Sequence, residues 1–341
     1  MNRWIAKIAM VAFVGPLVPT SVVGAKAASE KALSPAAREW QKKLKKIESS
    51  IEVTKKRIEN QKETTFSPDL FFMLAELYHD RSVAAVTLKK EKNPGVPEAE
   101  LDFSIERRYL QDAIEMYKVI EDRYPEYPTL DRVVFSMGQE YKVLGDDKSA
   151  LAAFKRTSDK FPSSSYGRRA LLEIGDIFFQ KKDYEYALGS YRKVIETKKS
   201  PEVWIAYQKA GMSLIQLDRW FDAVQSFEKI YTSPISDPDS ATDVQREEAL
   251  TASVWPLLEL SPQEVLSQPK YQKPVRYYGE VAGDKARYRR VLARLAQRAQ
   301  IKKRSADGIE ASLELFRLAD DVEEKRAAFE SAYLLAKKEK S

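Results

Sequence analysis

The chain has 341 residues, of which 43% are hydrophobic and 32% are charged, and its formal net charge is +6. This balance excludes disorder throughout, and the charge is too small to indicate nucleic-acid binding. The absence of cysteine excludes disulfides, thiolate metal sites, a thiol nucleophile and the lipid-bearing cysteine of a lipoprotein. With only 12 Gly, the composition favours an all-α fold.

The first 27 residues have the features of a secretory signal peptide. Arg3 and Lys7 precede the apolar stretch IAMVAFV. The sequence AKA, which offers a cleavage site, ends at residue 27. Two prolines interrupt an apolar stretch shorter than the roughly 20 residues of a membrane span, so a membrane anchor is the less favoured alternative. We expect an exported, soluble, periplasmic protein that is not a lipoprotein and keeps no transmembrane anchor after cleavage.

Residues 36–63 predict a helix with coiled-coil character. Its core positions alternate in steps of four and three, which places them on one seam. They are Trp40, Leu44, Ile47, Ile51, Thr54 and Ile58. Two interpretations stay open: the seam forms a homo-oligomer, or the helix docks on its own chain or simply caps the elements that follow.

Four sets of landmark residues recur between residues 67 and 233. Each set has a small residue, an aromatic or apolar residue three later, then an alanine and an aromatic four beyond it. The sets are Ala75/Tyr78/Ala113/Tyr117, Gly138/Tyr141/Ala150/Phe154, Gly175/Phe178/Ala187/Tyr191 and Gly211/Leu214/Ala223/Phe227. The last three sets advance by about 36 residues. We expect antiparallel helical hairpins in which the small residue faces the alanine and the aromatic fills the gap above it.

Turn signals and departures complete the pattern. Gly145 can cap one helix, and Pro125 and Pro162 end second helices. The first set contains an insertion, at about residues 81–107, that either extends its first helix or forms a projecting loop. Residues 243–341 predict degenerate helical repeats and a C-terminal cap.

The order small residue, aromatic, alanine, aromatic and proline resembles the consensus of the tetratricopeptide repeat. The third repeat departs from it, because Lys199 stands at the proline position. This resemblance implies a helical-hairpin solenoid preceded by the coiled-coil-like helix. It also implies a concave groove, lined by the first helices, that contacts an extended peptide or a partner helix.

The candidate groove is defined by the first-helix positions three before, one after and four after each small residue. These are Phe72, Glu76, His79, Phe135, Gln139, Lys142, Leu172, Asp176, Phe179, Gln208, Met212 and Ile215. Several are apolar beyond what hairpin packing requires, which favours burial of an apolar partner segment. The alternative is that another element of this chain, such as the N-terminal helix, fills the groove.

A second candidate surface is a basic face within residues 285–304, a stretch without acidic residues. Its members are Arg287, Arg290, Arg294, Arg298 and Lys302. Such a stripe could meet an acidic partner or an anionic envelope polymer. The favoured interpretation is a solvated face balanced by the acidic residues between 310 and 324.

Catalytic motifs are absent from the sequence, which has no GxSxG, Gly-rich phosphate loop or HExxH, and His79 is its only histidine. No catalytic residue, metal or cofactor is expected. Glu330-Ser331 resembles the Glu-Ser of lytic transglycosylases, which also have an α-superhelix. That family continues into a lysozyme-like domain, whereas the sequence here has only 10 residues after Ser331. An enzyme is therefore the disfavoured alternative.

Three stretches over residues 67–233 resemble the periplasmic tetratricopeptide-repeat proteins of myxobacterial gliding motility. They read SPDLFFMLAELY, YPEYPTLDRVVFSMGQEY and SPEVWIAYQKAGMSLIQLDRWFDAVQSFEKI. The layout is also similar to the periplasmic coordinator of the Tol-Pal system. Both resemblances imply a non-catalytic adaptor that binds envelope proteins. The alternatives are a peptidoglycan-linked enzyme or its regulatory subunit, and an outer-membrane assembly factor.

Overall fold

The computed structural model describes residues 33–60, 67–198, 200–234 and 240–339, and these residues form helices, turns and loops without a strand. The expected signal peptide lies outside the described residues. The chain divides into two compact units between Ala153 and Phe154, within helix α6 (Asp147–Lys160). Each unit is described by itself.

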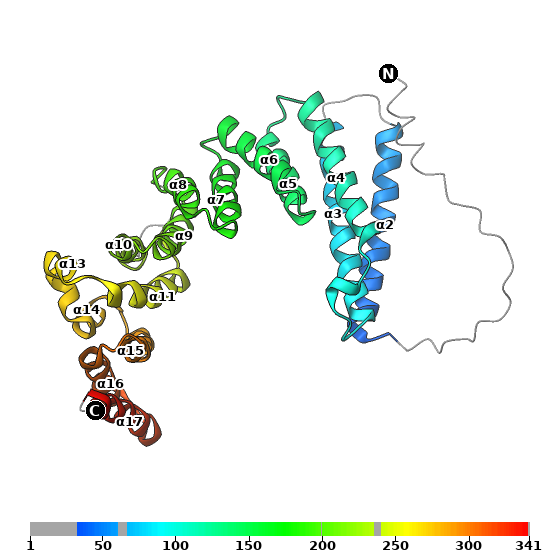
Figure 1. Ribbon diagram of the computed structural model, residues 1–341. Helices are drawn as coiled ribbons and strands as arrows, with labels where there is room; N and C mark the ends of the chain where they lie inside the picture. Colours follow the sequence, from blue (N-terminus) through cyan, green and yellow to red (C-terminus); the bar gives the residue numbers. More distant parts are fainter. Residues whose placement is uncertain (1–32, 61–66, 199, 235–239, 340–341) are drawn as a thin grey trace. The chain divides into compact units, whose positions relative to one another are not determined.

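The first unit is built around a group of long helices. In chain order its elements are α2 (Pro35–Asn60), α3 (Ser67–Lys92), the short 3₁₀ helix η1 (Glu98–Glu100), α4 (Ser104–Arg123), α5 (Leu130–Val143) and the first half of α6. α3 packs against both α2 and α4, and α4 packs against α5 (Figure 1).

The seam of α2 faces its own chain. Ile47, Ile51 and Thr54 are buried in the contact with α3, and Thr54 lies 3.9 Å from the sulfur of Met73. An ion pair between Arg81 and Glu48 joins the same two helices at 3.0 Å. This arrangement is the docked alternative that the sequence left open, while self-association through residues 36–63 stays a prediction.

The insertion in the first repeat forms a long hairpin. α3 continues without interruption to Lys92, and the connection to Ser104 contains η1. Lys89 pairs at 2.9 Å with Glu106, whose side chain is buried at the start of α4. The extra residues therefore lengthen α3, form the connection and begin α4.

The second unit continues with short antiparallel helices. Its elements are the second half of α6, then α7 (Ser165–Gln180), α8 (Tyr184–Ile195), α9 (Glu202–Gln216), α10 (Trp220–Tyr231), α11 (Asp243–Ala252), α12 (Val254–Glu259), α13 (Pro262–Ser267), η2 (Pro269–Gln272), α14 (Pro274–Val281), α15 (Lys285–Ile301), α16 (Ser305–Leu318) and α17 (Val322–Glu339). From α7 to α11, and again from α15 to α17, each helix packs against the next (Figure 1).

The same turn closes several first helices. The residue after the helix adopts a left-handed conformation at Gly145, Lys182, Asp218 and Lys303, with φ between 55° and 81°. In each turn the next amide donates to a carbonyl five residues earlier, as Asp183 does to Phe178 at 2.9 Å. This is the Schellman geometry that satisfies terminal carbonyls. Because only one of the four residues is glycine, the sequence revealed only that turn.

The contact at the small landmark differs from the expected one. A Cβ added to Gly175 would lie 2.3 Å from the ring of Tyr191, and one added to Gly211 would lie 2.7 Å from the ring of Phe227. The absent side chain therefore makes room for the aromatic ring, whereas we expected the small residue to face the alanine. The ring needs this space because its edge lies against the backbone of the first helix.

The C-terminal helices keep the repeat geometry without its aromatic landmarks. The left-handed Lys303 follows Ala296 at the spacing that separates Gly175 from Lys182. Gly308 of α16 lies against α15 and α17, since a Cβ there would be 3.3 Å from Ala299 and 2.8 Å from Leu335. Small residues thus set the close approach of these helices.

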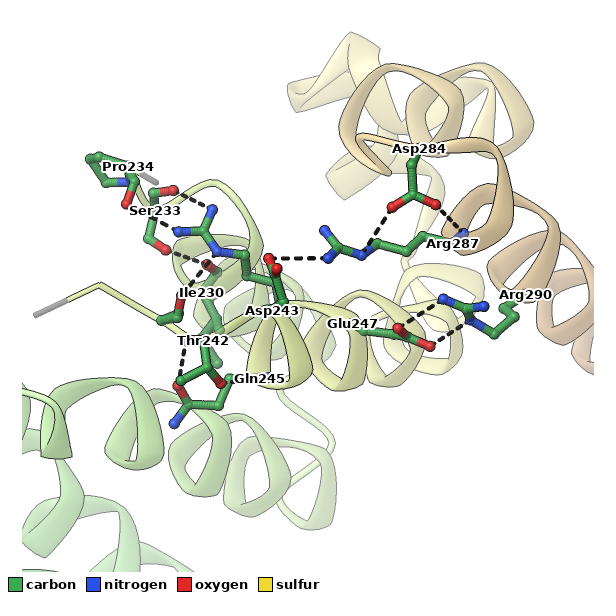
Figure 2. A network of polar contacts seen from close by, with 12 residues as sticks. Ile230, Ser233, Pro234, Thr242, Asp243, Gln245, Glu247, Asp284, Arg287 and Arg290 are labelled. Atoms are coloured by element: carbon green, nitrogen blue, oxygen red, sulfur yellow. Dashed lines mark hydrogen bonds and ion pairs between the residues drawn. The ribbon is translucent and has the colours of Figure 1, made fainter. Parts of the chain in front are cut away.

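A buried arginine fixes the connection between α10 and α11. Arg246 donates to the carbonyl oxygens of Ser233 at 2.6 Å, Pro234 at 3.0 Å and Ala241 at 3.0 Å. Thr242 caps α11 through a reciprocal contact with Gln245 (Figure 2). The start of α11 is therefore held against the end of α10.

A half-buried carboxylate, that of Glu228, holds η2 and α14 against α10. Glu228 accepts hydrogen bonds from Lys270 at 2.6 Å, Tyr271 at 3.0 Å and Tyr277 at 2.8 Å. Burial acts to raise the pKa of Glu228, but these hydrogen bonds outweigh it and leave the pKa below its usual value. Tyr231 contacts the Tyr277 hydroxyl at 2.6 Å and extends the network into the core.

Candidate partner-binding surfaces

Two acidic members of the candidate groove are held by tyrosines of their own hairpins. Tyr117 donates to Glu76 at 2.7 Å, and Tyr191 donates to Asp176 at 2.7 Å. The acid follows the small landmark and the tyrosine is the last landmark, so this is one contact repeated. The other two repeats have phenylalanine at the tyrosine position and Gln139 or Met212 at the acid position.

A cation from the next first helix neutralises each of these acids. Arg132 of α5 lies 3.1 Å from Glu76, and Lys209 of α9 lies 2.8 Å from Asp176. The acids therefore connect successive repeats within each unit. In the sequence, the acid occurs only in the two repeats that have tyrosine as their last landmark. This pairing is the signal from which the role of the acids in connecting repeats could have been inferred.

The only histidine also forms a contact between helices. Nδ1 of His79 in α3 lies 2.9 Å from the carboxylate of Glu140 in α5, whose side chain is only 4% exposed. Pairing with Glu140 raises the pKa of His79 because the carboxylate stabilises the protonated imidazole. His79 thus links α3 to α5 instead of standing free in a groove.

The apolar groove candidates divide into buried and accessible residues. Phe135, Leu172 and Ile215 are buried in the cores of their units, so they contribute packing. The rings of Phe72 and Phe179 contact neighbouring aromatics, Tyr117 at 5.9 Å and Tyr184 at 5.2 Å respectively.

The remaining groove candidates keep more solvent contact. Gln139 and Lys142 are half-buried on α5, and Gln208 is half-buried on α9. Met212 is 41% exposed. In the second unit the accessible candidates are therefore concentrated on α9.

A depression in the second unit brings together members of both candidate surfaces. It is lined by Gln208 of α9, by Arg294 of α15 and by residues of α11 that include Val244, Glu248 and Thr251. Gln208 donates to Glu248 at 3.1 Å, while the Val244 side chain is largely exposed. The depression offers hydrogen-bonding groups beside an apolar side chain, a combination suited to a peptide segment.

The basic face of α15 is paired with α11 and α12. Arg287 contacts Asp243 at 3.1 Å and Asp284 at 3.2 Å, and Arg290 contacts Glu247 at 2.5 Å (Figure 2). Arg298 lies 5.1 Å from the ring centre of Trp255, and Lys302 pairs with Glu259. We name the five cations Arg287, Arg290, Arg294, Arg298 and Lys302 the α15 ladder.

The partners of the α15 ladder differ from the expected ones. They precede α15 in the chain at a spacing of four, as Asp243, Glu247, Thr251, Trp255 and Glu259. Of the acids expected to balance the face, Asp320 and Glu324 instead pair with other cations of α15, Lys285 and Arg289 respectively. Arg294, opposite Thr251, is the ladder cation left without a carboxylate in the described part of the chain, and it hydrogen-bonds to Gln297 at 3.3 Å.

The residues considered for catalysis make ordinary structural contacts. Glu330 pairs with Arg326 at 2.9 Å on the surface of α17, and Ser331 hydrogen-bonds to Ser312 at 3.1 Å. Among the residues described, no group of three potential metal ligands occurs. Likewise, none of the described helices combines the length and apolar character needed to cross a membrane.

Comparison with known proteins places part of the chain in a class of helical-hairpin repeats. Residues 169–197 match the tetratricopeptide repeat family. These residues span most of α7 and all of α8, the hairpin in which Gly175 packs against Tyr191. The chain therefore carries a tetratricopeptide repeat at this position. A search of curated proteins gave no match.

Several solved structures are similar in fold at low sequence identity. A tetratricopeptide repeat protein from Parabacteroides merdae is 17% identical, with 69% of this chain and 87% of that chain covered and a TM-score of 0.39. Apo RapI is 14% identical, with 89% and 97% covered and a TM-score of 0.41. PilF of Pseudomonas aeruginosa is 14% identical, with 74% and 97% covered and a TM-score of 0.37. Because these TM-scores are below 0.5, the repeat assignment rests on residues 169–197 and on the packing described above.

Proposed function

We propose that this protein is an exported, non-catalytic scaffold that binds a protein segment within a bacterial cell-envelope machine. The observation that carries the proposal is the depression between α9, α11 and α15, where Gln208, Val244 and Arg294 remain accessible. The acidic groove candidates are paired within the repeats and several aromatic residues are buried there. These residues hold the helices in place and so position the depression. Export is supported by the signal-like residues 1–27.

The bound segment is an extended peptide or helix that places an apolar side chain against Val244 in the depression and extends along α9 to Met212, one helical turn beyond Gln208. Gln208 supplies an amide for the segment's polar groups, and Arg294 supplies a guanidinium. The resemblance of residues 67–233 to periplasmic gliding-motility proteins, and of the layout to the Tol-Pal coordinator, supports an envelope context. Oligomerisation through α2 is not required for this function.

The test is a crosslinking pull-down from intact cells with the protein tagged at its C-terminus. The variant combines Val244→Asp in the depression with Met212→Asp, one helical turn beyond Gln208 on α9, and both positions are exposed enough to tolerate a carboxylate. The matched control combines Leu266→Asp and Ile301→Asp, which are exposed apolar positions outside the depression. We expect envelope proteins that the control retains to be lost from the depression variant, and an identical set from both variants would contradict the proposal.

Two further measurements separate the alternatives. Osmotic-shock release of a protein whose N-terminus begins at Ala28 would establish export and cleavage. Digestion of purified peptidoglycan by the protein, abolished by Glu330→Gln, would establish the enzyme alternative and overturn the scaffold. We expect no digestion, because Glu330 is engaged with Arg326 on an exposed helix surface.

A further inference from the structure

The side of α2 away from its buried seam carries a basic surface, with Lys43 at its edge beside Trp40. All of its cations are exposed to solvent. They are Arg38, Lys42, Lys43, Lys45, Lys46, Lys56 and Arg57. We name this set the α2 basic face. With 26 residues the helix is about 39 Å long, so the face is an extended one-sided strip.

Most of these cations have no carboxylate to neutralise them. Of the four acids on α2, Glu39 pairs with Lys42, Glu52 pairs with Lys55, and Glu48 is directed to Arg81 of α3. The fourth, Glu59, is exposed at the end of the helix. Over the described ranges, no ion-pair partner contacts Lys45, Lys46, Lys56 or Arg57. These four unpaired cations form two adjacent pairs, Lys45-Lys46 and Lys56-Arg57, which are about 15 Å apart along the helix.

The chemistry of the face distinguishes between classes of anionic partner. Five of its seven cations are lysines, which act as point charges, whereas arginine provides the planar fork for bidentate recognition. Val53 is the only large apolar side chain of α2 that is clearly exposed, so a protein partner would lack apolar anchors. The single aromatic residue of α2, Trp40, is half-buried beneath Lys43, so bases have no exposed platform on which to stack.

The apolar side of α2 is already covered by α3, so the helix has no apolar face to insert into hydrocarbon. What remains is a strip of flexible lysine and arginine side chains along the helix, whose charges complement the phosphate groups of a bilayer surface. We propose that the α2 basic face binds the surface of a bilayer rich in anionic phospholipids. α2 lies along the headgroups without insertion, and the attraction is electrostatic and weakens as salt screens it.

The experiment measures binding of the full chain to vesicles of phosphatidylcholine with about 30% phosphatidylglycerol, and to vesicles of phosphatidylcholine alone. The neutral vesicles account for binding through the apolar stretch IAMVAFV. The test variant replaces Lys45, Lys46, Lys56 and Arg57 with glutamine. The matched control replaces four exposed lysines of other elements, Lys148, Lys193, Lys273 and Lys303, with glutamine and has the same net charge.

We expect the wild-type chain and the matched control to prefer anionic vesicles. Each cation near an anionic surface contributes about five-fold to binding, so the test variant should bind at least about 100-fold more weakly. Addition of about 0.5 M NaCl should release the wild-type chain. Circular dichroism checks that both variants keep their helices.

Three results with vesicles would overturn the proposal. They are equal binding of the wild-type chain to neutral and anionic vesicles, equal loss in the test variant and the matched control, and binding that survives high salt. Selective binding of an acidic protein or nucleic acid, without affinity for anionic vesicles, would assign the face to another class of partner and would also overturn it.

Discussion

α2 and α15 are both basic helices with one buried apolar face, yet their cations serve different purposes. Four of the five cations in the α15 ladder contact Asp243, Glu247, Trp255 or Glu259 on the facing helices. On α2, the cations at residues 45, 46, 56 and 57 contact no carboxylate in the described residues. A high density of basic residues on a helix therefore does not identify an accessible basic surface.

The difference between the two helices lies in their neighbours. α15 packs beside α11 and α12, which present acidic or aromatic side chains at a spacing of four. Within the described residues α2 packs mainly against α3 through its seam, and no acidic side chain of these residues pairs with the cations at positions 45, 46, 56 and 57. The neighbouring element decides whether a basic face holds the fold together or remains available for binding.

The largest expected effects concern the apolar seams, which should make the two helices alike. Ile51 of α2 and Leu295 of α15 are both buried. Ile51→Ala and Leu295→Ala should each lower the free energy of unfolding by about 2 to 4 kcal/mol, measured by urea denaturation. If Ile51→Ala instead leaves stability unchanged and lowers the oligomeric mass in light scattering, the seam of α2 forms an intermolecular coiled coil and the comparison fails.

Charge reversal should lower the free energy of unfolding when it is made on α15 and leave it nearly unchanged when it is made on α2. Arg287→Glu with Arg290→Glu places carboxylates against Asp243 and Glu247 and should cost about 1 to 2 kcal/mol of unfolding free energy. Lys45→Glu with Lys56→Glu on α2 should change it by less than about 0.5 kcal/mol.

A compensating variant tests whether the α15 effect is electrostatic. Adding Asp243→Arg and Glu247→Arg to the reversed α15 should recover at least half of the loss, because opposite charges then face each other again. Equal costs for reversal on α2 and on α15 would show that the α2 cations also have structural partners.

A smaller effect concerns the pH dependence of the unit that contains α2. The pKa of His79 is raised by Glu140, so this contact stabilises the fold fully below the unfolded value near 6.5 and is lost as pH rises through the raised value. His79→Gln should remove that loss, which we expect to be about 0.5 kcal/mol or less because the imidazole is partly exposed. An unchanged dependence of unfolding free energy on pH between 6 and 8 would contradict this role.

Much of the repeat architecture could be predicted from residue spacing, because close helix packing requires small residues at fixed positions. The hairpin of Gly175 and Tyr191 is confirmed by the family match at residues 169–197. The turns at Lys182 and Asp218 could not be predicted in the same way, since neither residue is a usual left-handed cap.

The candidate surfaces were less predictable because a helical phase does not specify what the next helix covers. The phase placed Phe135, Leu172 and Ile215 beside the groove, but neighbouring helices bury them. It also pointed to the cations of α15, whose partners sit on α11 and α12 across the intervening residues 260–284. The α2 basic face could not be predicted either, because the sequence does not show which side of α2 its neighbours leave uncovered.

The most direct test of the central claim, that the cations of α2 are available while those of α15 are engaged, is lysine footprinting of the intact chain. A brief treatment with an amine-acetylating reagent is followed by mass spectrometry of the modified peptides. Lys46 and Lys56 should be acetylated faster than Lys302, which pairs with Glu259. Equal rates, or slower modification of Lys46 and Lys56, would contradict the account.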